Sequence, residues 1–181
     1  MKKIIVIALF LVIASSITAQ AQIAFDTTSN FPAATTSNAT FSHTTSGNDR
    51  ILFVGVWVNA NPGNNVTGAT YAGIPMVQIG HHSFGGGNAG DNVFMLVNPA
   101  LGSNNVVVSL DSAQNISVQS VSYTGARQTG QPDNFVSYGP GGPTTGIVTN
   151  SITTVADNSW LVEWNQPRTG IVSSSGSVIR I

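Results

Sequence analysis

Three histidines are the residues of this chain best suited to acid–base or metal chemistry. They are His43, His81 and His82, and the chain has no cysteine. A protein-bound zinc ion takes three or four ligands from His, Cys, Asp or Glu. His81 and His82 would point to opposite faces of a strand, so one ion could hardly use both there. We expect imidazoles that are exposed or singly hydrogen-bonded beside a glycine-rich loop.

That glycine-rich loop comes near a calcium-binding pattern. Residues 86–91 read GGNAGD, and the calcium-binding nonapeptide begins G-G-x-G-x-D. Ala89 stands where glycine is wanted, and a single copy lacks the stacked repeats by which that motif works. Asp91, helped by Asn side chains and backbone carbonyls, is a weak calcium candidate. We expect no resident metal and no cofactor.

The sequence lacks the signatures of common hydrolases. No G-x-S-x-G nucleophile elbow occurs, and residues 82–87 (HSFGGG) indicate a hairpin loop. A glycosidase needs two carboxyl groups about 5–9 Å apart. Glu163 is the only glutamate, and most aspartates stand in turn-like contexts where they bond their own backbone. The prediction is that the protein is not an enzyme.

Aromatic side chains leave sugar binding open, since they offer an apolar platform with a polar edge. Trp160 and Trp164 lie in an apolar run that favours the core. Trp57 also has apolar neighbours, but it could instead line a sheet face. Phe84 and Tyr138 stand among Gly and Pro and are better placed for exposure. The candidate ligand-contact aromatics are therefore Phe84, Tyr138 and Trp57.

The elements that position these residues are predicted to be strands. Short β-branched and aromatic runs alternate with Gly, Asn, Pro and Ser clusters, and no helical periodicity is present. About ten strands in one domain predict an all-β, jelly-roll-like single β-sandwich. The runs are 39–43, 50–58, 66–71, 76–79, 92–97, 105–110, 116–123, 146–155, 159–164 and 177–181.

The run at residues 50–58 is apolar on both faces. Leu52, Val54, Val56 and Val58 alternate with Ile51, Phe53, Gly55 and Trp57. Such a strand belongs at the centre of a sheet that is covered on both sides. We predict that Val54 and Val56 are almost fully buried.

The first 21 residues read as a secretory signal peptide. Lys2 and Lys3 precede an apolar run of about ten residues, and Ala19-Gln20-Ala21 offers a small-residue cleavage site. That run is too short to span a bilayer, which needs about 20 residues. The expected mature domain is residues 22–181, secreted or at the cell surface, with no membrane span.

The charges of this mature part argue against nucleic acid as a partner. Four arginines and no lysine stand against seven acidic residues, so the net charge is −3. Phosphate binding needs clustered Lys and Arg.

The order of five segments resembles a widespread, functionally uncharacterised β-sandwich family of secreted bacterial proteins. The more specific parts are the YAG turn at 71–73, VNPALGSNNV at 97–106 and YTGARQ at 123–128. The resemblance implies a jelly-roll-like sandwich in an extracellular setting, and it brings no catalytic residues. Family members continue by another strand or two, which implies that this sandwich lacks a closing strand. The segments are 50–58, 66–80, 92–110, 120–130 and 157–164.

Two hypotheses on function follow. The first is a non-catalytic structural or adhesive subunit of an extracellular matrix, sheath or filament, whose partners are copies of itself or other surface proteins. An open sheet edge could recruit a neighbour's strand. Residues 22–28, which carry Ile23 and Phe25, are the candidate donor segment. The second hypothesis is an extracellular carbohydrate-binding module whose partners are glycans.

Overall fold

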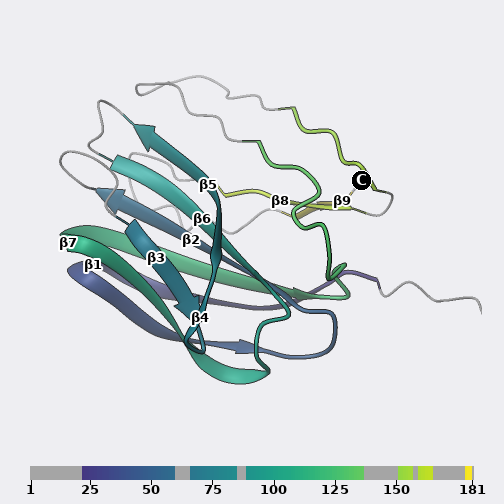
Figure 1. The fold of residues 1–181 in the computed structure, drawn as a ribbon, viewed down its shortest axis with the longest axis horizontal. Helices are drawn as coiled ribbons and strands as arrows, with labels where there is room; N and C mark the ends of the chain where they lie inside the picture. Colours follow the sequence, from purple (N-terminus) through teal and green to yellow (C-terminus); the bar gives the residue numbers. More distant parts are fainter. Residues whose placement is uncertain are drawn as a thin grey trace, which may run out of the picture.

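The computed structural model describes residues 22–59, 66–84, 89–136, 151–156, 159–164 and 178–180. Within these ranges the chain is all-β, without a helix, as predicted (Figure 1). Seven strands form one sheet and two form a small second sheet. The strands are β1 (Ala24–Thr45), β2 (Ile51–Asn59), β3 (Val66–Tyr71), β4 (Ile74–Pro75), β5 (Val77–Phe84), β6 (Ala89–Val97), β7 (Gly102–Thr124), β8 (Trp160–Val162) and β9 (Val178–Arg180).

The large sheet is antiparallel and strongly curved. Its strand order is β4-β3-β7-β2-β6-β5, and β1 pairs with β7 outside this path. The first half of β7 pairs with β3 and its second half with β2, so this one long strand connects the two parts of the curved sheet. The sheet therefore nearly closes around its interior. The runs predicted separately at 105–110 and 116–123 are parts of this single strand.

Strand β1 is folded into two arms. A straight strand of its 22 residues would be about 70 Å long. Instead its two ends meet, because the Asp26 carboxylate accepts a hydrogen bond from the backbone N–H of Ser46 at 3.0 Å. The bend lies between Thr36 and Asn38, where the pairing with β7 skips residues 110–113. We call residues 24–36 the first arm and residues 38–45 the second arm. Figure 1 shows β1 and β7 turning back together at the left of the view.

β2 is the central strand that the sequence predicts. It pairs with β6 on one side and β7 on the other, and Val54 and Val56 are 0% exposed. Its inner face joins an apolar cluster drawn from β1, β2, β3, β6, β7 and the residue between β4 and β5, so the curved sheet surrounds its own core. This inner cluster is Ala39, Leu52, Val54, Val56, Val58, Ala69, Tyr71, Met76, Phe94, Val106, Val108, Leu110, Ile116 and Val118.

The other face of β2 is covered by segments that follow β7 in the chain. Ile51 and Phe53 pack there in a second cluster that also holds Tyr123, Trp160 and Val162. Two glycines make room for this cover. A Cβ at Gly55 would lie 1.8 Å from the ring of Trp164, and one at Gly80 would lie 2.1 Å from the ring of Phe135. The covering segments can approach the sheet because these positions have no side chain.

Three further predicted elements differ from the structure. β1 begins at residue 24 rather than 39, and β5 runs on through both adjacent histidines to Phe84, so residues 82–84 are strand and not loop. Residues 151–155, expected to be strand, are irregular. Main-chain pairing with β7 accounts for the first arm, which contains too many Thr, Ser and Asn residues for the apolar pattern to mark it as a strand.

Candidate functional site

The most organised polar site is a buried network around His43 on the second arm. Its Nδ1 lies 2.8 Å from Ser120 Oγ and 3.2 Å from Ser29 Oγ, and its Nε2 lies 3.0 Å from Ser122 Oγ. Ser122 in turn donates to the Asp26 carboxylate at 2.7 Å. We call these five residues the clasp, because they tie both arms of β1 to the second half of β7.

The directions of the hydrogen bonds in the clasp follow from its carboxylate. Ionised Asp26 only accepts, so the Ser122 hydroxyl proton points to it. Ser122 Oγ must then accept from His43, which places the imidazole proton on Nε2. His43 Nδ1 is therefore an acceptor, within hydrogen-bond distance of the hydroxyls of Ser120 and Ser29.

Electrostatics agree with a neutral imidazole and an ionised carboxyl group. Burial lowers the pKa of His43 to about 4, and the charge of Asp26 only partly offsets this. For Asp26, burial raises the pKa, but hydrogen bonds from Ser46 and Ser122 outweigh it and the net shift is downward. At neutral pH the clasp therefore holds one negative charge and no positive one.

The order Ser120, His43, Ser122, Asp26 resembles the arrangement of a hydrolytic triad, with one extra hydroxyl between base and acid. Ser120 and Ser122 are 0% exposed and His43 is 1% exposed. A substrate could not reach the hydroxyl of Ser120 without the sheet opening. In this conformation the clasp is closed to a substrate, and its hydrogen bonds join the strands.

Sequence reasoning missed the clasp, because its members come from three distant stretches of chain. His43 was expected to be exposed or singly hydrogen-bonded, and it is neither. One signal was present: Ser120 and Ser122 continue the face of Ile116 and Val118. Two hydroxyls on a buried face require polar partners.

A second polar group lies on the outer face of the sheet. Asp91 on β6 stands directly opposite Trp57 on β2 and His82 on β5. Burial raises the pKa of Asp91 to about 7, and its Oδ1 has no hydrogen-bond partner within the described structure. The side chain of Trp57, next to Asp91 on this face, is half-buried.

The remaining sequence candidates do not form one site. Within the described ranges no three His, Asp or Glu side chains are close enough to share a metal ion. Asp91 is in a strand rather than in the predicted calcium loop, of which residues 86–88 lie outside the described residues. Tyr138 and the predicted signal peptide also lie outside them, and of Phe84 only the backbone is described.

The predicted donor segment is paired within its own chain. Ala24 stands opposite Thr124 and Phe25 opposite Tyr123 on β7. Phe25 packs edge-on against the Tyr123 ring, 6.3 Å between centroids, although it is 57% exposed. The segment is thus not free in this structure.

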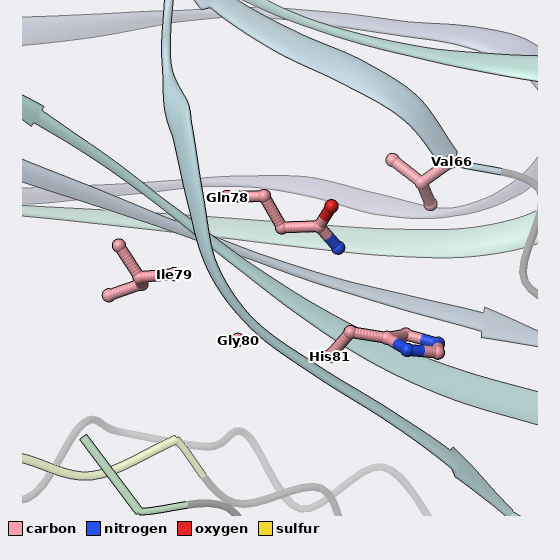
Figure 2. A pocket seen from close by; sticks show the side chains of 5 residues that line it. All are labelled: Val66, Gln78, Ile79, Gly80 and His81. Atoms are coloured by element: carbon pink, nitrogen blue, oxygen red, sulfur yellow. The ribbon is translucent and has the colours of Figure 1, made fainter.

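Two long sheet edges lack a strand neighbour in the described part of the chain. β1 pairs only with β7, and β5 only with β6. Beside β5 is an open depression of about 490 Å³, lined by Val66, Gln78, Ile79, Gly80 and His81. Figure 2 shows Gln78 and His81 extending to the same side as Val66, and Gln78 donates to the buried Asn92 side chain at 2.7 Å. Among the described residues that line this depression there is no Trp, Tyr or Phe.

No helix in the described ranges has the length and hydrophobicity needed to cross a membrane. Comparison of the chain with protein-family models, with curated proteins and with solved structures finds no match.

Proposed function

We propose that this protein is a non-catalytic structural or adhesive subunit of an extracellular assembly, built on a jelly-roll-like sandwich. The observation that carries the proposal is the pair of sheet edges on β1 and β5. Unpaired strand edges are templates for another chain, and soluble proteins protect them with charged residues, above all lysine. Between them these two strands contain one charged residue, Asp26.

Apolar side chains near the edges add to this support. Ile74 and Val77, on β4 and at the start of β5, are 54% and 63% exposed. Such exposure beside a strand edge favours association with another chain. The expected export signal and the low charge of the mature part agree with an assembly outside the cell.

A carbohydrate-binding module is the second candidate. The open depression beside β5 offers the amide of Gln78 and the imidazole of His81 to sugar hydroxyls. It ranks second because the described residues that line the depression include no Trp, Tyr or Phe as a platform for a sugar ring.

The test is the oligomeric state of purified residues 22–181 over a wide concentration range, by sedimentation velocity and negative-stain imaging. We expect concentration-dependent polymers. A protein that stays monomeric at every concentration contradicts the assembly, and a monomer that binds on a glycan array supports the second candidate.

A further inference from the structure

The first arm of β1 is weakly held by burial. None of its side chains is buried, whereas the second arm places Ala39, His43 and Thr45 in the interior. The first arm therefore adds little to the apolar core. Segments with few buried apolar contacts are those that open most readily while the rest of a domain stays folded.

Its main-chain pairing is also irregular. The ladder with β7 is interrupted between Phe25 and Thr27 and again between Phe31 and Ala34. Pro32, in the second interruption, has no N–H to donate. Side-chain contacts also hold the arm: its part of the clasp (Asp26 and Ser29), the hydrogen bond from the Thr28 hydroxyl to the Ser120 carbonyl at 2.9 Å, and the rings of Phe25 and Phe31. Of these rings, that of Phe31 packs against the inner cluster.

Detachment of the arm would remove hydrogen-bond partners from buried groups on β7 and on the second arm. Ser122 would lose the Asp26 carboxylate, and His43 would lose the Ser29 hydroxyl. Unsatisfied buried polar groups are costly, so the vacated edge strongly favours a replacement strand. The replacement must carry a carboxylate and, three residues later, a hydroxyl. The first arm of a second copy carries both at the required positions.

We propose that the first arm exchanges between copies, so that residues 24–36 of one chain pair with β7 of the next. This inference rests on the proposed function and names its mode of contact. The hinge is the bend at residues 36–38, where the Thr36 hydroxyl donates to the Asn38 carbonyl at 2.8 Å and accepts from the Asn38 N–H at 3.1 Å. Because donor and acceptor surfaces differ, the contact is head-to-tail and propagates unless the rotation closes a ring.

Cysteine cross-linking tests the exchange, since the chain has no cysteine of its own. Asn30 on the first arm stands opposite Gln119 on β7, and Thr40 on the second arm stands opposite Val107. Directly opposed residues of paired strands are close enough for a disulfide. Monomers of Asn30→Cys and Gln119→Cys would be mixed, concentrated until they assemble, and oxidised. Thr40→Cys mixed with Val107→Cys is the matched control on the same two strands.

We expect a covalent dimer on a non-reducing gel from the first-arm mixture and no covalent dimer from the control mixture. The double variant Asn30→Cys/Gln119→Cys should form an intrachain disulfide that locks the arm and abolishes assembly. If assembly occurs but the first-arm mixture gives no covalent dimer, or the locked variant still assembles, the exchange is wrong and the proposed function stands. If no variant and no wild-type chain assembles, the proposed function fails as well.

Discussion

At the scale of single residues, the protein environment shifts the pKa values of His43 and Asp91 in opposite directions. His43 sits in the clasp with its pKa lowered to about 4, and Asp91 sits on the outer face with its pKa raised to about 7. In both cases burial is the main cause, because it disfavours the charged form. Their effects on stability therefore oppose each other in mildly acidic solution.

The expected effect of His43 is a loss of stability on acidification. Between pH 6.5 and about 4 the unfolded chain binds a proton that the folded chain does not, so the free energy of unfolding falls as pH falls. Asp91 does the reverse. Between pH 3.8 and about 7 the folded chain keeps a proton that the unfolded chain has lost, so stability falls as pH rises. Each slope is at most about 1.4 kcal/mol per pH unit.

Denaturant unfolding of two single variants separates the contributions. Asp91→Asn should lose stability steadily from pH 6.5 to 4. His43→Gln, whose amide can keep one donor and one acceptor in the clasp, should gain stability from pH 7 to 4. If the free energy of unfolding depends on pH in the same way in the wild type and both variants, neither group has a shifted pKa.

At the scale of elements, the strands with the strongest apolar patterns were predictable and the others were not. The limits of β3 match the prediction, and β2 differs only at its ends. A strand that is buried on one or both faces needs apolar residues there, and this pattern is visible in the sequence. The first arm of β1 buries no side chain, so no apolar pattern could reveal it. β7 was split in two because residues 111–115, at its bend, are exposed or half-buried and interrupt the apolar run.

Truncation of the central strand should be strongly destabilising. Val54→Ala or Val56→Ala removes two methyl groups from the inner cluster and leaves a cavity, at a cost of about 1–3 kcal/mol. Val155→Ala is the control, since Val155 is 74% exposed. Equal denaturation midpoints for all three variants would mean that β2 is not central.

The cover on the outer face makes a separate prediction. Gly55→Ala would place a methyl group where the Trp164 ring lies, so the ring must move. We expect a shift of tryptophan emission to longer wavelength together with a lower melting temperature. Gly68→Ala, where a Cβ meets nothing within 4 Å, is the matched control. An unchanged emission spectrum in Gly55→Ala would mean that the Trp164 ring does not pack against Gly55.

At the scale of the whole molecule, stability has to come from burial and hydrogen bonding. The chain has no cysteine, and its described residues hold no group of three metal-ligating side chains. We therefore expect EDTA to leave the melting temperature nearly unchanged. A large drop that calcium restores would overturn this, and Asp91 would then be the first ligand to test.

The pairing of β1 with β7 also sets an order of events in folding. Ala24 and Thr124 are neighbours in the sheet but a hundred residues apart in the chain. A ribosome releases the first arm long before its partner strand, and closing so long a loop is slow. β2 and β6 can pair earlier, since a shorter stretch of chain separates them. In pulse-labelling during refolding, amides of the first arm should thus gain protection last, and a newly made molecule passes through a stage with a vacant β7 edge.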